Sequence, residues 1–282
     1  MATYPARGLQ RILAGSTTPV LRARLYDQDG DTIINAEGAT CTITRADGTV
    51  VATGRATTID DATDELNCEL TTAEAVTLDV LTAAWTLGGT VRATTHHRVV
   101  GGFIYSLTAL RERRGLESFP TATLLAERDR ITDLIEEHTG LVWCPQFDIE
   151  EFIGHGTYRH VMVGRPVRTI RSITIDETAV DLTSADIDVD PVSGVISGAW
   201  FCGLCSIGVE HGTDAPPADL RDAALTASAD RLLRSSNTIS ARARSITNDM
   251  GITQQLSYAG EDHPTGLDEV DAVIVKHSRA RI

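Results

Sequence analysis

Cysteine and histidine are the residue types in this chain that could carry chemistry, and their spacing decides what that chemistry would be. Cys202 and Cys205 form a Cys-x-x-Cys pair, which occurs in zinc sites and in thiol redox sites. A zinc site needs a second pair of ligands at comparable spacing, and the sequence has none. A redox pair opens a helix after a strand, whereas these two residues lie in a segment typical of a strand or hairpin. We therefore interpret most of the five cysteines as buried small apolar residues of a cytosolic protein.

The other polar clusters do not complete a catalytic or metal site either. The run Asp27–Asp31 resembles the first half of a calcium loop but lacks the distal glutamate, so a hairpin turn explains it better. His96 and His97 are neighbours on a predicted strand and point to opposite faces. His155 and His160 have no carboxylate or cysteine cluster beside them in the sequence. Because no serine-hydrolase, phosphate-loop or zinc-protease motif occurs, we predict that the chain is not an enzyme and has no catalytic, metal or cofactor-binding residues.

The charge of the chain limits its partners. The formal net charge is -14 and the isoelectric point is about 4.9, which argues against a protein that reads nucleic-acid sequence, since that needs basic surface. Solubility alone explains the acidic surface, and an acidic wall that keeps DNA from adhering inside a channel is the alternative. No apolar run reaches the length of a membrane span, and the first residues do not resemble a secretory signal. We expect a protein that is made in a cytoplasm.

Residues 1–106 are predicted to form an all-β domain. Strands are expected where apolar and polar residues alternate, in residues 20–26, 39–44 and 89–94. Two Asp-Gly pairs, at Asp29 and Asp47, supply the positive φ angles of tight hairpin turns. Strands of this length and spacing predict an immunoglobulin-like β-sandwich. The charged residues 107–118 follow as a linker.

Residues 119–282 are predicted to form a helical domain with β-hairpin insertions, so the fold class of the whole chain is α+β. A helix follows Pro120 and ends at Gly140, because its apolar residues recur on one face and glycine commonly follows a helix. Its other face is acidic, as an ordinary solvated helix surface would be. Pro216 opens a second, alanine-rich helix. Strands are expected between the two helices, in residues 157–163, 170–175, 180–189 and 194–209.

The last residues of the chain combine a turn, a short apolar run and a basic end. Residues 270–275 predict a strand, because branched side chains favour extended backbone. A strand at this place can pair with the exposed sheet edge of a neighbour, so we predict a docking tail. Deleting residues 271–282 is then expected to abolish docking and to leave the monomer folded. The predicted docking residues are Val270, Val273, Ile274, Val275, Lys276, Arg279, Arg281 and Ile282.

Three segments, taken in order, resemble the head-to-tail adaptor (connector) proteins of long-tailed actinobacteriophages. The first is the end of the first helix, Ile135–Gly140, followed closely by Trp143–Pro145. The second is the helix that starts at Pro216. The third comprises residues 240–245, 249–251 and 264–274. The resemblance covers residues 119–282 and lies in the order and spacing of these segments. The N-terminal sandwich departs from the minimal adaptor pattern and looks like an added domain.

The resemblance implies a structural virion protein of the neck, at the head–tail junction, made in the cytoplasm of a bacterial host. It implies a closed ring, commonly of about twelve copies, in which one face of each subunit binds a different face of the next. The ring would bind the portal protein and a downstream neck, head-completion or tail protein, while double-stranded DNA passes through its channel without sequence-specific binding. No cofactor and no membrane are implied. The acidic helix then supplies the channel-lining candidates Glu127, Asp133, Glu136 and Glu137.

Two alternatives stay open. The chain could be a host- or carbohydrate-binding adhesion protein of the virion that uses the N-terminal sandwich as its reader. Such sites stack sugars on several aromatic side chains, and the first domain has few, among them Tyr26, Trp85, Phe103 and Tyr105. The second alternative is a hydrolase built around His155 and His160, which metal analysis of the purified chain would test.

Overall fold

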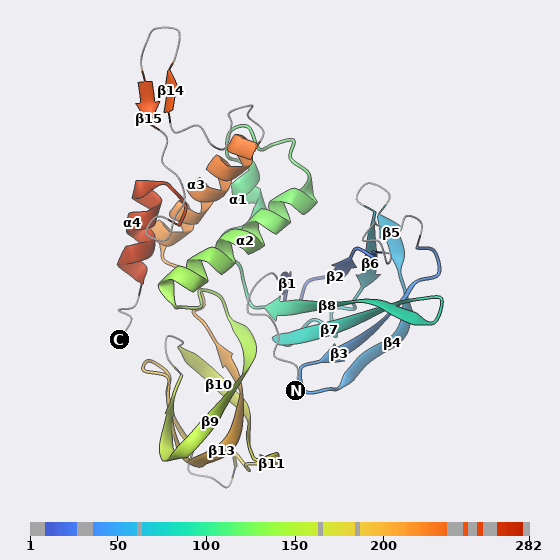
Figure 1. Cartoon of the computed structure of the whole chain (residues 1–282), viewed down its shortest axis with the longest axis vertical. Helices are drawn as coiled ribbons and strands as arrows, with labels where there is room; N and C mark the ends of the chain where they lie inside the picture. Colours follow the sequence, from blue (N-terminus) through green and yellow to red (C-terminus); the bar gives the residue numbers. More distant parts are fainter. Residues whose placement is uncertain are drawn as a thin grey trace. The chain divides into compact units, whose positions relative to one another are not determined.

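The computed structural model describes residues 9–26, 36–60, 64–162, 166–183, 187–235, 245–247, 253–255 and 264–278 (Figure 1). Its fold is mixed α+β with several separate sheets and more strand than helix, which confirms the predicted class at that level. The chain divides into two compact units, each built from two stretches of sequence: Met1–Gly102 with Cys144–Asp214, and Phe103–Trp143 with Ala215–Ile282. The β region that the sequence analysis assigned to the second domain therefore groups with the N-terminal strands.

The N-terminal part of the first unit is built from two sheets that share one apolar core. Its strands are β1 (Gln10–Leu13), β2 (Val20–Ala23), β3 (Thr40–Arg45), β4 (Val50–Ala56), β5 (Thr58–Asp60), β6 (Glu65–Glu69), β7 (Asp79–Leu87) and β8 (Thr90–Val100). The larger sheet has the order β1-β8-β7-β3-β4, and the smaller has the order β2-β6-β5. Burial alternates along β2, β3 and β6, as the period-two pattern predicts for strands with one face inward. Trp85 of β7 is fully buried in the shared core.

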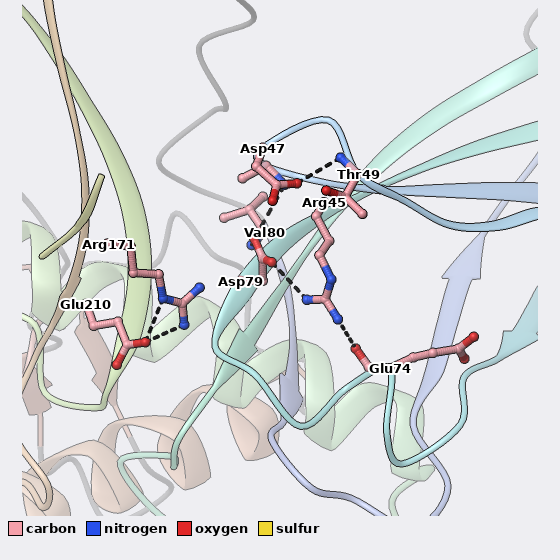
Figure 2. Close-up of polar contacts among 9 residues, drawn as sticks. Arg45, Asp47, Thr49, Glu74, Asp79, Val80, Arg171 and Glu210 are labelled. Carbon is pink, nitrogen blue, oxygen red and sulfur yellow. Dashed lines mark hydrogen bonds and ion pairs between the residues drawn. The ribbon is translucent and has the colours of Figure 1, made fainter. Parts of the chain in front are cut away.

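The turn between β3 and β4 follows directly from an Asp-Gly pair. The Asp47 carboxylate accepts a hydrogen bond from the Thr49 N–H at 2.8 Å (Figure 2). Gly48 has a φ of 86°, which glycine adopts without strain. The Arg45 N–H donates to the Thr49 carbonyl at 2.8 Å and closes the hairpin. The turn predicted at Asp47 is confirmed, and the one predicted at Asp29 lies outside the described residues.

Two long antiparallel strands dominate the rest of the first unit. The sheet comprises β9 (Gln146–Val161), β10 (Val167–Ile175), β11 (Thr178–Ala179), β12 (Asp188–Asp190) and β13 (Val195–His211). β13 pairs with β9, β10 and β12, so it is the central strand (Figure 1). Phe201 and Ile207 of β13 point into a core that is separate from the one around Trp85. The strand predicted at 157–163 starts earlier, at Gln146, because its first half also pairs with β13.

The second unit consists mainly of helices in the part of the chain that the structure describes. They are α1 (Leu107–Arg111), α2 (Thr121–Thr139), α3 (Ala218–Ser235) and α4 (Asp268–His277). A two-stranded sheet is formed by β14 (Ser245–Thr247) and β15 (Thr253–Gln255). α1 occupies the start of the predicted linker. α2 buries Leu124, Ile131 and Ile135, as its period predicts. Gly140 ends α2 with a φ of 67° and donates its N–H to the Glu136 carbonyl at 3.0 Å, which confirms the predicted end.

The C-terminal residues form the helix α4, so the strand predicted over residues 270–275 is wrong. Val270 and Ile274 lie four residues apart, share one helix face and are both buried. Acidic residues occupy the first turn of α4, and Lys276 and His277 occupy its last turn. This order of charges stabilises a helix through its dipole. The spacing and the charges together outweigh the preference of branched side chains for extended backbone.

Candidate interaction surfaces

The C-terminal helix is bound to its own unit. Lys276 Nζ donates to Asp219 Oδ2 at 2.7 Å, and His277 Nε2 lies 3.0 Å from Asp219 Oδ1. These hydrogen bonds, from Lys276 first and His277 second, hold the pKa of the Asp219 carboxyl well below its ordinary value. The Trp143 ring meets the His277 ring edge-on, with 5.7 Å between ring centres. Because Asp219 lies in the first turn of α3, the end of α4 is fixed to the start of α3.

These contacts change the docking prediction. Val270 and Ile274 are buried in the second unit, and Lys276 is paired within it, so all three hold α4 in place. Val275 is 66% exposed, and Val273 is half-buried, so a docking role for these two stays a prediction. The remaining predicted docking residues lie outside the described part of the chain, namely Arg279, Arg281 and Ile282.

Glu127 is buried between α2 and α3, so its predicted exposed position is wrong. Its carboxylate accepts hydrogen bonds from Arg130 Nη2 at 2.6 Å and from Arg231 Nη1 at 2.5 Å. A covered carboxylate with two guanidinium partners contributes little negative potential to a surface, because its charge is neutralised locally. The other channel-lining candidates are half-buried or exposed on α2, and their role stays a prediction; they are Asp133, Glu136 and Glu137.

An exposed apolar surface, here called the ribbon surface, lies on the outer face of β9 and β13. It consists of Ile153, Tyr158, Trp200, Cys202 and Leu204. Ile153 and Leu204 are direct cross-strand partners and are 68% and 55% exposed. The rings of Tyr158 and Trp200 pack at 4.6 Å between centres with a tilt of 57°. Large apolar side chains gathered in this way mark a contact surface rather than scattered exposure.

A glycine bulge shapes the ribbon surface. The register between β9 and β13 shifts near Gly156, which has a φ of 77°. A Cβ atom at Gly156 would lie 3.0 Å from the Trp200 ring, so the ring rests on this glycine. This surface was not among the predictions from the sequence. The sequence pattern that could have indicated it is the alternation of Trp200, Cys202 and Leu204 with buried residues. This pattern occurs in a strand that is apolar on both faces.

The histidine pair that could have carried chemistry belongs to the sheet. His97 is buried, and burial together with the neighbouring His96 lowers its pKa to about 3, which leaves it neutral at physiological pH. His97 Nε2 lies 2.7 Å from Thr95 Oγ1, and the Trp85 indole N–H donates to the same hydroxyl at 2.8 Å. His97 is therefore a core residue that orients Trp85 through a shared hydroxyl.

The Cys-x-x-Cys pair and the later histidines are also parts of the sheet. Cys202 is exposed and Cys205 is buried, because alternate faces of β13 carry them. They cannot bind one ion together. His160 stacks on Phe152 at 3.7 Å between ring centres and lies 3.1 Å from Glu150 Oε1. This histidine therefore packs within the sheet.

A buried charged cluster joins β8 to β9 and β13 in the first unit. Arg98 Nη2 donates to Asp148 Oδ1 at 2.7 Å, and His211 Nε2 lies 2.7 Å from Asp148 Oδ2. Gln146 donates to the same carboxylate at 3.4 Å. Arg98 and His211 are buried. We interpret the cluster as a structural tie, since removing the carboxylate would leave the buried Arg98 and His211 without their partner, which is costly.

Two further ion pairs of the first unit fix loops and strands (Figure 2). Arg45 donates to Asp79 Oδ2 at 2.9 Å and to the Glu74 carbonyl at 3.0 Å, which fastens the loop before β7 to the end of β3. Arg171 Nε donates to Glu210 Oε1 at 2.7 Å and joins β10 to β13. Both pairs are partly covered and serve the fold.

Among the described residues, no group of three or more His, Cys, Asp or Glu side chains is placed to hold a metal ion. Within the same ranges, no helix has both the length and the apolar character to cross a bilayer. No protein-family model matches the chain, and no curated protein matches it. The ribbon surface and the anchored helix α4 are thus the features from which a function can be inferred.

Proposed function

We propose that this chain is a structural virion protein, a head-to-tail adaptor that forms a ring of about twelve copies between the portal and the next neck or tail protein. Double-stranded DNA would pass through the ring without sequence-specific binding. One support is that the helical parts of the segments that carry the adaptor resemblance fall on α2, α3 and α4, which pack into a single unit, whereas residues 240–244 and 249–251 lie outside the described residues. We infer that this unit is the adaptor domain.

The N-terminal sheets are, in this proposal, an immunoglobulin-like accessory domain. The support is the pairing of a five-stranded and a three-stranded sheet around one core that contains a buried tryptophan, Trp85. The β9–β13 sheet belongs to the same compact unit and extends the surface that the accessory domain offers to partners.

The observation that carries the assembly proposal is the ribbon surface. Protein interfaces concentrate tryptophan, tyrosine and large aliphatic side chains at their centres, and this surface has that composition. A ring requires each subunit to present one face to a different face of the next subunit. We assign the ribbon surface as one of these two faces, and its occupant as the neighbouring copy of this chain.

Light scattering and negative-stain imaging of the chain mixed with its portal test this function. The expected result is a closed ring of about a dozen copies bound to the portal. The double variant Ile153→Ser/Leu204→Ser should stay monomeric with an unchanged circular dichroism spectrum, because both positions are exposed. Val192→Ser is the matched control, since Val192 is 77% exposed outside the ribbon surface and should not affect assembly.

Two outcomes would count against the proposal in different ways. A wild-type chain that stays monomeric and binds no portal would remove the adaptor function itself. A double variant that forms rings as well as the wild type would keep the function and remove the ribbon surface as the contact.

The adhesion alternative gains no support from the first domain. Trp85 and Tyr105 are buried, Phe103 is half-buried and Tyr26 is 52% exposed, whereas sugar stacking uses several exposed rings. A glycan screen of the full chain is expected to give no binding, and a saturable glycan signal would favour adhesion.

A further inference from the structure

Two of the five cysteines, Cys41 and Cys68, meet inside the N-terminal sheets. Cys41 lies on β3 of the five-stranded sheet, and Cys68 lies on β6 of the three-stranded sheet. Both are fully buried and belong to the same core as Trp85. Each occupies an inward position in a strand whose burial alternates, so the two thiols point toward each other from opposite sheets.

Side-chain contacts link the strands that carry the two thiols. Cys41 is the cross-strand partner of Arg55 on β4. The Arg55 guanidinium donates to the carbonyl of Glu69, the residue after Cys68, at 2.8 Å. One side chain thus spans from the strand pair of Cys41 to the strand of Cys68. The Cys68 thiol, together with burial, raises the pKa of the Cys41 thiol.

We propose that Cys41 and Cys68 are a redox modification site, which a two-electron oxidant of the peroxide class converts into a disulfide between the two sheets. In the structure both are free thiols. Two S–H bonds break and one S–S bond forms, so the cysteine pair is oxidised by two electrons. The two protons and two electrons released reduce one hydrogen peroxide to two molecules of water.

The other cysteines do not offer this arrangement. Cys202 and Cys205 point to opposite faces of β13, so they cannot form a bond with each other. A single buried cysteine would be explained as a small apolar core residue. Two cysteines that enter one core from different sheets are, in contrast, placed on opposite sides of the space that a disulfide would cross.

The proposed bond would act by restricting the unfolded chain. It would close a loop from residue 41 to residue 68 and would add a covalent link between the two sheets. Because both thiols are buried, oxidation requires local opening of the sheets or takes place while the chain folds. The inference does not depend on the adaptor function. For a virion protein it would add stability after release from a reducing cytoplasm.

The test uses the full chain with Cys202→Ser, which removes the exposed thiol and prevents cross-links between molecules. Hydrogen peroxide is added to the folded protein in one arm and during refolding from urea in the other. Mass spectrometry of a non-reduced digest should find the peptides of Cys41 and Cys68 joined and two hydrogens lighter. The thermal midpoint of the first unit should rise by about 10 °C or more and return when dithiothreitol is added.

A variant that also carries Cys68→Ala is the control and should show no peroxide-dependent rise in midpoint. Linkage in either arm with a raised midpoint supports the proposal. The absence of linked peptide in both arms overturns it, and so does a linked protein whose midpoint is unchanged or lower. The reversal by dithiothreitol gives the same comparison within one protein if the control variant folds poorly.

Discussion

Replacing Asp148 by asparagine should lower the free energy of unfolding of the first unit by about 3 kcal/mol or more. The carboxylate lies 2.7 Å from both Arg98 Nη2 and His211 Nε2, and its own side chain is only 19% exposed. Asparagine keeps the size of the side chain but removes its charge. Breaking a buried ion pair from one side costs about 3–5 kcal/mol, because the other charge stays buried without its counter-ion. The amide oxygen of asparagine can still accept one hydrogen bond, so the expected loss of unfolding free energy lies at the lower end of that range.

Asp214 provides a matched control in the same unit. It pairs with Arg168 at 2.6 Å, a distance as short as those at Asp148, but its side chain is 82% exposed. An exposed ion pair contributes less than about 1 kcal/mol. Asp148→Asn and Asp214→Asn make the same chemical change and the same change in net charge. The difference between the two losses of unfolding free energy therefore measures how much burial of the ion pair contributes.

Urea unfolding followed by tryptophan fluorescence measures both variants. The chain has three tryptophans, and in a Trp143→Phe background the remaining two, Trp85 and Trp200, report only on the first unit. A loss of about 3 kcal/mol should lower the urea midpoint by roughly 1–3 M, given slopes of about 1–3 kcal/mol per molar. Equal midpoints for Asp148→Asn and Asp214→Asn would refute the view that the buried cluster is a structural tie.

Three further predictions use single positions. Burial lowers the pKa of His97 to about 3 from 6.5, so below pH 6.5 the unfolded chain binds a proton that the folded chain does not. The free energy of unfolding should have its full value above pH 6.5 and should fall by about 1.4 kcal/mol per pH unit toward pH 3. The variant His97→Gln should show a flatter dependence on pH in urea titrations. Gly156→Ala should cost about 1–2 kcal/mol, because its φ of 77° is strained for a side chain, whereas Gly102→Ala, with open space at its Cβ, should cost little by the same assay. Ile274→Ala should lower the free energy of unfolding of the second unit by about 2–5 kcal/mol, whereas Val275→Ala, at an exposed position, should change it by no more than about 0.5 kcal/mol. Unfolding followed by circular dichroism measures both, and equal losses would contradict the burial of this face of α4.

Local patterns in the sequence were enough to predict several elements. The alternation in residues 39–44 predicted β3, and Asp47 predicted the turn that follows it, because a hairpin of this kind depends on a few neighbouring residues. Gly140 predicted the end of α2 for the same reason. The α+β class followed from the change of period between the two halves of the chain.

Features that depend on distant residues could not be predicted in this way. Arg98 and Asp148 are 50 positions apart, and His211 is 63 positions beyond Asp148, so no local pattern links them. The ribbon surface had a visible alternation, but β13 is apolar on both faces, and alternation alone does not say which face is outside. Glu127 was misplaced because its helix face carries both apolar and acidic residues, and Arg231, which helps to cover it, comes from α3.

The anchoring of α4 limits where the proposed ring contacts can lie. A tail that docks on a partner must be free to leave its own domain, whereas α4 buries Val270 and Ile274 and places Lys276 against Asp219. Deleting residues 271–282 would remove part of the second unit, so a loss of portal binding in that truncation would not separate docking from folding. Val275→Asp changes an exposed position of α4 and leaves these contacts intact. If α4 contributes to portal docking from its outer face, this variant loses portal binding as a folded protein, and if the outer face of α4 makes no portal contact, portal binding is unchanged.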